Sequence, residues 1–502
     1  MQTGNVSAAV RAFEAAVDAA PEDADARYYL ANAYRDLFRL KDAEREMRKV
    51  VAQRPTHAKS YSALGIILAE AGRPGEAVAV YEAAMAIDPA YVNAATNWVN
   101  TQQYLSGVTE ERLAHSHSRW AALHAAETPT SDFPTERPTD RPLVVGFVSP
   151  DLAKHPVGLL SVRLFENLDH AAIRPIVFST RPTPYEDEIS RRIARTAKWV
   201  TVFGMNDDVI AALIRASKVD ILFDLSGHTA HHSLKLFARR AAPVQISWLG
   251  YTGTTGIPAM DYVLANAQLT PPGTDAFYNE RILGLARTHA CFDPPPDAPA
   301  VSPAPFASNG FVTFGCLNNP VKISRETLAS FARILTRVPN SRLKLRYKSM
   351  GASDVEARLR SVLAAHGIAP ARVDVAGHVP GVQFLGTYNE IDIALDTSPY
   401  SGCFTTCEAL WMGCPVVAFP GATFAGRQSA SILTAAGQTD LIAKDRAGYE
   451  DLAVALAGDH DRIARLRAYL REHVAASYLC NGPAFAQDFT QTLQTAWTQS
   501  LR

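Results

Sequence analysis

The sequence predicts an all-α array of helical repeats followed by two α/β lobes, each built on a Rossmann-like, doubly wound parallel sheet. Three observations predict this fold class. Positions near the N-terminus recur with a fixed period, short β-branched runs alternate with helical patterns further along, and two proline-rich stretches divide the chain. A chain of 502 residues also exceeds what one hydrophobic core can fill, so several domains are expected.

The composition restricts the class of protein. Hydrophobic residues make up 47% and charged residues 20% of the chain, as in a globular protein. The net charge of -1 provides no overall field that would attract nucleic acid or an acidic membrane. The six cysteines are scattered without paired close spacings, and no segment has the pattern of a signal peptide or a membrane span. We therefore expect a cytoplasmic protein with neither nucleic acid nor a membrane as its partner.

The N-terminal region repeats every 34 residues, as Pro21, Pro55 and Pro89 show. The same interval relates Ala9, Ala43 and Ala77; Phe13, Met47 and Tyr81; Ala16, Val50 and Ala84; Leu30 and Leu64; and Ala31 and Gly65. Small residues let two antiparallel helices approach closely, and the prolines end the second helix of each unit. The period resembles the tetratricopeptide (TPR) repeat, whose stacked units form a superhelix with a groove for an extended peptide. The coincident registers argue against a chance helical bundle.

The predicted array is irregular at both ends. Its first unit starts in mid-repeat near Gly4. After Pro89 only Trp98 stays in register, and Glu111 stands where a small residue is expected. We expect residues 92 to about 122 to form a degenerate repeat that docks onto the following domain.

Polar, proline-rich segments separate the array from the first lobe and the two lobes from each other. The predicted domains are TPR repeats at 1–122, a linker at 123–142, a first lobe at 143–293, an interlobe linker at 294–309, a second lobe at 310–480 and a C-terminal helix at 481–502. The predicted strands are Leu143–Ser149, Pro175–Ser179, Trp199–Phe203, Ile221–Leu225, Val244–Leu249 and Tyr262–Ala265, then Phe311–Cys316, Leu343–Tyr347, Arg372–Val375, Ile391–Asp396 and Pro415–Phe419. Ligands of such sheets bind at the carboxyl ends of the strands, so the cleft between the lobes is the expected site.

The strongest local signal is the segment 396–414, DTSPYSGCFTTCEALWMGC. A strand ends at Asp396, a Gly/Ser turn follows, and a helix is predicted to start near Thr405. Thr405, Thr406 and the first N–H groups of this helix would bind an anion, because the helix dipole favours negative charge there. Glu408 would hold a ribose diol. The alternative is that Thr405 caps the helix and Glu408 closes a capping box.

Two further loops follow strands of the second lobe. In FGCLNNPVKISR, Lys322 would reach the same cleft and balance the charge of a diphosphate leaving group, although a lone lysine is more often a solvated surface charge. The loop Gly377-His378-Val379 would grip a base through its backbone, or it is a plain surface loop.

The first lobe offers candidate acid–base groups in the loops after its strands. SPDLAKHPVG places His155 after the first strand, and DLSGHTAHH places Asp224, His228, His231 and His232 after another. The histidine cluster has no clear carboxylate or cysteine partner at ligand spacing, so we do not expect a metal there. The loop WLGYTGTTG lacks the Walker lysine and the Rossmann spacing, and its glycines would allow close approach of a sugar or an acceptor.

These motifs, in this order, resemble the O-linked N-acetylglucosaminyltransferase (O-GlcNAc transferase) family over nearly the whole chain. The segments that carry the resemblance are the TPR array, SPDLAKHPVG, PVQISWLGYTGTTG with the nearby MDY, NNPVKIS and SGCFTTCEALWMGCPVV. The resemblance implies a GT-B fold, an inverting mechanism, a UDP-sugar donor, a protein acceptor, and no metal or other cofactor.

The resemblance also implies roles for individual residues. Lys322 resembles the lysine that holds the donor diphosphate, Thr405 and Thr406 the phosphate ligands at the helix terminus, Glu408 the acidic ribose ligand, and His155 the histidine assigned as general base. The expected donor site further includes Asn319, His378, Val379, Gly402 and Cys403.

The chain departs from the family pattern in three places. The family's His-Thr-Thr reads Cys-Phe-Thr-Thr, so Cys403 or Phe404 stands where a histidine would stack on uracil. Asn319 matches a glutamine beside the diphosphate lysine. Only the proline-rich stretch stands where the animal enzymes carry a long interlobe insertion. These changes put the donor preference in doubt.

The resulting hypothesis is in-line transfer of N-acetylglucosamine from UDP-GlcNAc to a Ser or Thr hydroxyl of a protein held partly by the TPR groove. His155 is the first candidate for the group that takes the acceptor proton, followed by Asp224 and His228. Three alternatives stay open: a transferase that uses GDP-fucose or UDP-glucose, a peptide-binding scaffold with an inactive transferase module, and a UDP-sugar epimerase. Binding of UDP rather than GDP would separate the donors, and absence of nucleotide binding would favour the scaffold.

Overall fold

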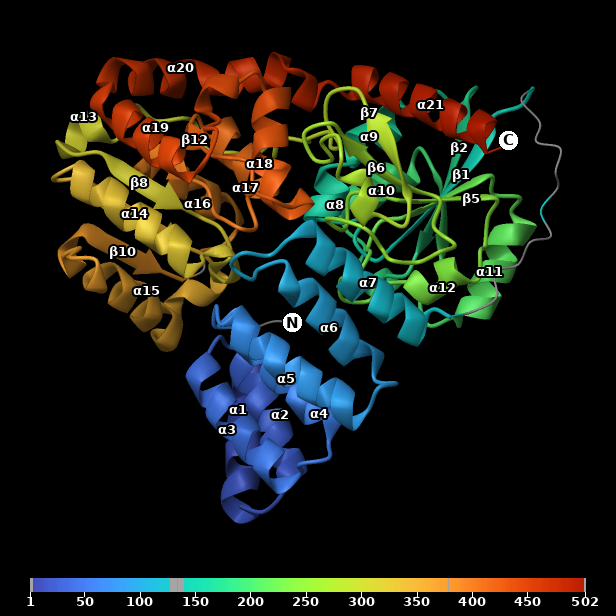
Figure 1. Cartoon of the computed structure of the whole chain (residues 1–502), viewed down its shortest axis with the longest axis horizontal. Helices are drawn as coiled ribbons and strands as arrows, with labels where there is room; N and C mark the ends of the chain where they lie inside the picture. Colours follow the sequence, from blue (N-terminus) through green and yellow to red (C-terminus); the bar gives the residue numbers. More distant parts are fainter. Residues whose placement is uncertain (1–2, 127–132, 134–139, 378, 501–502) are drawn as a thin grey trace.

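The computed structural model describes residues 3–126, 133, 140–377 and 379–500. Figure 1 shows a helical array (blue), a first lobe (green) and a second lobe (yellow to orange), with two C-terminal helices lying along both lobes. Most of the predicted linker at 123–142 falls on 127–132 and 134–139, which lie outside the described residues.

The helical array consists of antiparallel helices with the predicted period. Its helices are α1 Thr3–Ala19, α2 Ala24–Asp36, α3 Leu40–Gln53, α4 Ala58–Glu70, α5 Pro74–Ile87, α6 Val92–Gln102 and α7 Glu110–His124. Pro21, Pro55 and Pro89 each stand two residues after a helix, as expected. In the second and third units the matching helix positions are buried, and a Cβ added to Gly65 would lie 2.4 Å from the ring of Tyr81. These residues therefore repeat because the helices pack closely.

The last helical pair of the array docks onto the first lobe, as the degenerate repeat predicted. The Thr96 hydroxyl lies 3.0 Å from His232 Nε2. His117 Nε2 lies 2.7 Å from the Tyr251 hydroxyl. Figure 1 shows α6 and α7 between the rest of the array and the two lobes.

The first lobe contains a seven-stranded parallel sheet in the order β3-β2-β1-β4-β5-β6-β7. Its strands are β1 Leu143–Ser149, β2 Ile173–Ser179, β3 Lys198–Thr201, β4 Ile221–Asp224, β5 Val244–Ser247, β6 Tyr262–Asn266 and β7 Arg281–Leu285. Strand β7 was not predicted from the sequence. This strand lies at the sheet edge, where exposed Arg281 and Gly284 interrupt the buried residues and hide the apolar run.

The second lobe contains a five-stranded parallel sheet in the order β10-β9-β8-β11-β12. Its strands are β8 Thr313–Cys316, β9 Arg342–Arg346, β10 Val373–Ala376, β11 Ile393–Leu395 and β12 Val416–Val417. All predicted strands of both lobes are present, with ends that differ by at most two residues.

Helices connect the strands of both sheets, and the two last helices have different partners. The helices of the lobes are α8 Pro156–Leu159, α9 Val162–Asn167, α10 Glu188–Ala194, α11 Asp207–Ala216, α12 Leu234–Ala238, α13 Phe306–Asn309, α14 Arg325–Arg337, α15 Ser353–Ala365, α16 Gly381–Gly386, α17 Phe404–Trp411, α18 Phe424–Ala435, α19 Arg446–Gly458, α20 His460–Ala476 and α21 Gly482–Gln499. Helix α20 packs in the core of the second lobe, whereas Phe489 and Trp497 of α21 are buried in that of the first. The C-terminus thus ties the lobes together.

Each sheet has one point where the strand order reverses direction. In the first lobe it lies between β1 and β4, and in the second between β8 and β11. Loops at such a point diverge to opposite faces of the sheet and leave a crevice beyond the strand ends, where ligands of doubly wound sheets bind. The fold therefore singles out four loops: His155 and Lys322 lie within two of them, Asp224 is the last residue of β4 before the third, and Thr405 lies in α17 directly after the fourth.

Candidate nucleotide-sugar site

The two loops at the switch point of the second lobe are joined by side-chain hydrogen bonds. Lys322 Nζ donates to the carbonyl oxygen of Ser401 at 2.9 Å. Thr405 Oγ1 donates to Asn318 Oδ1 at 2.6 Å, and Asn318 Nδ2 donates to Thr397 Oγ1 at 3.2 Å. The ammonium group of Lys322 and the start of α17 therefore lie side by side at one edge of the sheet.

Helix α17 starts at Phe404 with no side-chain cap, because its N-cap residue is Cys403. The Thr406 hydroxyl is within 2.8 Å of the Ser429 hydroxyl, while that of Thr405 bonds to Asn318. The capping-box alternative, with Thr405 as the cap, is therefore wrong. An uncapped helix start leaves N–H groups and a positive dipole end for an anion.

The cationic group at this site is buried and held in place. Lys322 Nζ lies 4.0 Å from the centroid of the Tyr400 ring. Burial lowers the pKa of Lys322 to about 8, while Asp396 and two cysteine thiols act in the opposite direction. A buried, partly desolvated ammonium gains strongly from an anionic ligand, because the surroundings screen charge poorly.

The turn before α17 needs glycine at position 402. A Cβ added to Gly402 would lie 2.6 Å from Thr406 Oγ1 and 3.0 Å from Thr405 Oγ1. The N–H of Gly402 also donates to Asp396 Oδ1 at 2.7 Å. Asp396 thus anchors the turn that follows β11, and glycine lets the two threonine hydroxyls fold back against it.

Glu408 occupies a desolvated position one turn into α17. Burial raises its pKa to about 8. Tyr347 and Tyr388 lie near enough for the Glu408 charge to raise their own pKa values, and the Tyr388 hydroxyl donates to the Thr405 carbonyl at 3.0 Å. Among the described residues no cation pairs with this carboxyl group, and a carboxyl group in such surroundings is suited to hydroxyl groups of a ligand.

The remaining donor-site candidates lie around this core. Asn319 Oδ1 accepts the N–H of Val321 at 3.2 Å and shapes the short turn that carries Lys322. Val379 is half-buried in the loop after β10, and His378 lies outside the described residues. Cys403 Sγ lies 4.0 Å from His289 Nε2 of the first lobe.

His155 lies at the switch point of the first lobe, where it is the N-cap of α8. Its Nδ1 accepts the N–H of Val157 at 3.3 Å, and Asp151 Oδ1 lies 3.9 Å from the same nitrogen. The side chain of His155 is 46% exposed. Partial desolvation lowers its pKa, Asp151 raises it, and Arg181 and Lys348 lower it further. Lys348 belongs to the second lobe, so the His155 ring lies within electrostatic range of that lobe.

Asp224 and His228 have structural partners that the sequence did not reveal. Asp224 is fully buried and accepts the N–H groups of Ser226 at 3.1 Å and Gly227 at 2.8 Å. Burial raises the pKa of Asp224 to about 6. His228 is also fully buried, and its Nε2 donates to the carbonyl oxygen of Thr255 at 2.7 Å. These contacts anchor loops and weigh against both residues as proton acceptors.

The glycine-rich loop WLGYTGTTG packs against protein, which corrects the expectation that its glycines face a ligand. A Cβ on Gly250 would lie 1.7 Å from the Leu225 carbonyl oxygen. Gly256 has a φ of 73°, and a Cβ there would lie 2.5 Å from the backbone of His117 in α7. Only Gly253 of the three opens onto free space. The loop thus mainly seats the helical array.

Two residues beside the site were not among the predicted ligands, although Tyr400 lies within the segment 396–414. Tyr400 supports Lys322 with the face of its ring. His289 is buried beside Cys403. Burial lowers its pKa to about 4, so the ring is neutral at pH 7. His289 stands alone in its segment, LARTHACFDP, and only the fold brings it to α17.

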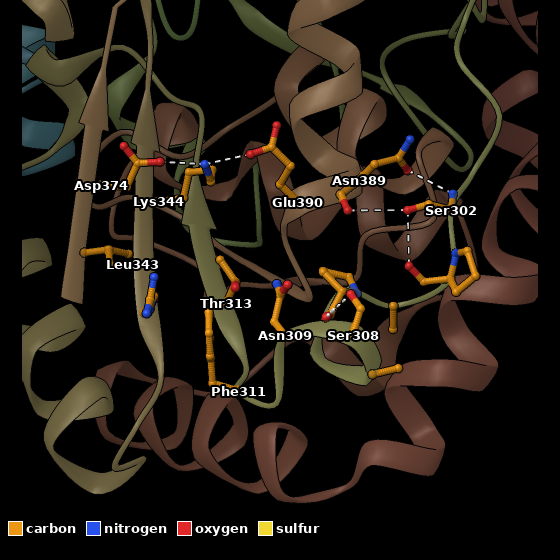
Figure 2. Close-up of a pocket in the computed structure, with 15 residues that line it drawn as sticks. Ser302, Ser308, Asn309, Phe311, Thr313, Leu343, Lys344, Asp374, Asn389 and Glu390 are labelled. Carbon is orange, nitrogen blue, oxygen red and sulfur yellow. Dashed lines mark hydrogen bonds and ion pairs between the residues drawn. The ribbon is translucent and has the colours of Figure 1, made fainter. Parts of the chain in front are cut away.

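A large cavity elsewhere in the second lobe is not the candidate site. This cavity of about 630 Å³ lies at the amino ends of β8 and β9, opposite the edge that carries Lys322 (Figure 2). Its lysine, Lys344, is 2.5 Å from Asp374 and 2.8 Å from Glu390. Arg342 also lines the cavity, so its two cationic and two acidic side chains balance, and Lys344 is already paired with both carboxylates.

The described part of the chain shows no cluster of three or more His, Cys, Asp or Glu side chains suited to a metal ion. All six cysteines are free thiols. None of the described helices combines the length and apolar character that crossing a membrane requires.

Comparisons with known proteins match both parts of the molecule. Tetratricopeptide-repeat models match residues 1–65 and 58–91. A solved structure of a Thermobaculum terrenum O-GlcNAc transferase mutant superposes with a TM-score of 0.92 at 32% identity, covering 100% of this chain and 95% of that one.

Curated relatives include plant proteins. A Petunia hybrida protein named "Probable UDP-N-acetylglucosamine--peptide N-acetylglucosaminyltransferase SPINDLY" is 35% identical over 422 residues, which cover 82% of this chain and 45% of the relative. An Arabidopsis thaliana protein named "Probable UDP-N-acetylglucosamine--peptide N-acetylglucosaminyltransferase SEC" is 27% identical over 340 residues. These residues cover 66% of this chain and 34% of the relative. The chain therefore spans about half the length, or less, of the curated relatives it matches.

The family assignment rests on the two lobes. The model of glycosyl transferase family 41 matches residues 108–293 and 307–489, which include the first lobe, the second lobe and α7 of the array. The match also contains every candidate residue at both switch points, from His155 to Glu408. The chain belongs to glycosyl transferase family 41.

Proposed function

We propose that this protein transfers N-acetylglucosamine from UDP-GlcNAc to Ser or Thr hydroxyls of proteins, with inversion at the anomeric carbon. One observation carries the proposal. Lys322 Nζ bonds to Ser401, and Thr405, only four residues further on, lies at the uncapped start of α17. A buried ammonium and a helix N-terminus beside each other match the diphosphate of a nucleotide sugar. The named relatives and the family support the same reaction.

The leaving group would be stabilised by this pair of elements. As the bond from the sugar to the diphosphate breaks, negative charge accumulates on the departing UDP. The Lys322 ammonium and the first N–H groups of α17 would meet that charge without reorganising, because hydrogen bonds already hold both elements in place. The Thr405 and Thr406 hydroxyls would supply further hydrogen bonds once they turn toward the phosphates.

Glu408 would bind the ribose of the donor. Glu408 follows the two threonines on the same helix, so its carboxyl group would meet a part of the donor next to the diphosphate. A ribose diol offers two donors and two acceptors, so it can satisfy this carboxyl group in either protonation state.

His155 would take the proton of the acceptor hydroxyl. With Nδ1 accepting the N–H of Val157, the proton of a neutral ring resides on Nε2. Nε2 can accept the proton of the acceptor hydroxyl only in the other tautomer, in which the ring proton is on Nδ1. Asp151 Oδ1, 3.9 Å from Nδ1, would stabilise that tautomer. The lowered pKa of His155 keeps the ring neutral, as a base must be.

The acceptor protein would approach along the array. A cavity of about 460 Å³ lies between the α4–α5 turn, the α6–α7 loop and the second lobe, and Val321 and Ser324, on either side of Lys322 in the sequence, line it. An extended chain leaving the TPR groove through this opening would pass close to the donor.

The test compares donors and nucleotides. We expect UDP to raise the melting temperature more than GDP does, and we expect radiolabelled N-acetylglucosamine to pass from UDP-GlcNAc to a protein acceptor. If the protein prefers GDP and transfers fucose from GDP-fucose, the proposed donor is wrong but the protein is still a glycosyltransferase. Failure of every nucleotide to bind would overturn the proposal in favour of a peptide-binding scaffold.

A further inference from the structure

The Tyr400 ring contacts both a cation and a second tyrosine. Lys322 Nζ lies 4.0 Å from the Tyr400 centroid, and the Tyr104 ring is stacked on Tyr400 with centroids 4.9 Å apart and planes inclined by 12°. Tyr400 therefore links Tyr104 to the ammonium group of Lys322.

Tyr104 does not belong to the lobe that holds Lys322. It lies in the loop between α6 and α7 of the helical array, 103–109. Neighbouring residues of that loop contact both lobes: Gln103 accepts a hydrogen bond from Thr252 of the first lobe, and Ser106 Oγ donates to Glu326 Oε2 of the second at 2.5 Å. Figure 1 shows the loop reaching into the region where the lobes meet.

The same end of the array has another fixed contact with the second lobe. Glu110, the first residue of α7, forms an ion pair with Arg427 of α18, and both side chains are largely buried. With contacts on either side, the α6–α7 loop has little freedom to move while both lobes stay in place. Tyr104 is therefore a fixed support for Tyr400.

We propose that Tyr104 is a positioning residue for the donor diphosphate, which it aligns through Tyr400 and Lys322. The inference rests on the proposed role of Lys322 in binding UDP. It assigns to the helical array a part in donor binding, besides its proposed part in acceptor binding. A change in the array near α6 would then alter the affinity for UDP without touching the nucleotide.

The first measurement is the dissociation constant of UDP by titration calorimetry. Tyr104→Leu removes the stacked ring, and we expect it to weaken UDP binding about 5- to 10-fold, in the range of a lost cation–π arrangement. Tyr104→Phe keeps the ring and should bind UDP as the wild type does. Ser106→Ala, which removes a hydrogen bond of the same loop, is the matched control and should also leave UDP binding unchanged.

A double-mutant cycle separates positioning from general support of the fold. In a Lys322→Ala background no ammonium remains to be aligned, so Tyr104→Leu should cause no further loss of UDP affinity. If Tyr104→Leu does not fold, Tyr400→Leu in the same cycle tests the same link. A loss of equal size in both backgrounds, or wild-type binding by Tyr104→Leu, would overturn the inference. If Lys322→Ala alone binds UDP normally, the proposed function of Lys322 fails instead.

Discussion

The two lobes use their switch points in opposite ways. In the second lobe the loops after β8 and β11 are joined by hydrogen bonds, and they hold Lys322 and Glu408 in desolvated positions. In the first lobe the loop after β4 is fastened by buried Asp224, while His155 after β1 remains exposed. Under the proposed function, the switch point of the second lobe would bind the donor, and that of the first lobe would present the proton acceptor.

This difference matches the demands of two substrates. A nucleotide diphosphate is the same in every turnover, so a rigid and charged site can be built for it in advance. Acceptor proteins differ from one another in sequence, so the first lobe needs only one proton acceptor and space for the acceptor chain. The comparison predicts that changes in the second lobe affect donor binding, while changes at His155 affect only the transfer step.

Lys322→Ala should have the largest effect. Loss of the ammonium leaves the charge of departing UDP without its cation, and we expect sugar transfer to fall by about 10²- to 10³-fold. The measurement is the rate of transfer from UDP-GlcNAc at saturating acceptor. Transfer at a rate near that of the wild type would show that the second lobe is not the leaving-group side.

His155→Ala should reduce transfer by about 10²-fold, as expected for loss of a general base. Because His155 lies in the other lobe, the dissociation constant of UDP should remain that of the wild type. Measuring kcat and UDP affinity on the same preparation separates the two quantities. Weakened UDP binding together with an unaltered kcat would reverse the roles assigned to the lobes.

The pH dependence should show both lobes at once. Below the lowered pKa of His155 the base is protonated, so kcat/KM should fall toward acidic pH. As pH rises through about 8, Lys322 loses its proton, and kcat/KM for the donor should fall again. The pKa of Glu408 is also about 8, so a variant is needed to distinguish the two groups. Lys322→Arg is this control, because arginine keeps its proton and should remove the alkaline fall in kcat/KM. If the fall persists unchanged in Lys322→Arg, another group causes it.

Asp224→Asn should have the smallest effect on catalysis. Asparagine keeps the shape but replaces one accepting oxygen by an NH2 group, which cannot accept the N–H of Ser226 or Gly227. We expect a loss of about 1–3 kcal/mol in the free energy of unfolding and transfer within a few-fold of the wild type below the melting temperature. A 10²-fold loss of transfer without a change in stability would make Asp224 the base.

Sequence patterns predicted the fold well where they were strongly periodic. The 34-residue period located the array because its small residues, such as Gly65 against Tyr81, are required by close helix packing. Buried parallel strands were recognisable as short apolar runs, whereas the edge strand β7 was not, since two of its five residues are exposed. The switch points followed from the alternation of strands and helices.

Other features of the site depend on contacts between distant segments, which one sequence does not display. Nothing near Tyr104 indicates that it stacks on Tyr400, because the two residues belong to different domains. His289 reaches Cys403 only after both lobes are folded. The glycines of WLGYTGTTG have a pattern typical of ligand loops, yet Gly256 approaches α7 instead. Local motifs give residue types, and the fold decides what they face.

The most direct test of the central claim compares UDP with UMP, which differ only in the outer phosphate. The claim is that Lys322 and the start of α17 meet on the diphosphate. By calorimetry the wild type should bind UDP about 10-fold or more tightly than UMP, as a charge-assisted hydrogen bond provides. In Lys322→Ala the two constants should lie within about 3-fold of each other. An unchanged preference for UDP in that variant would contradict the account.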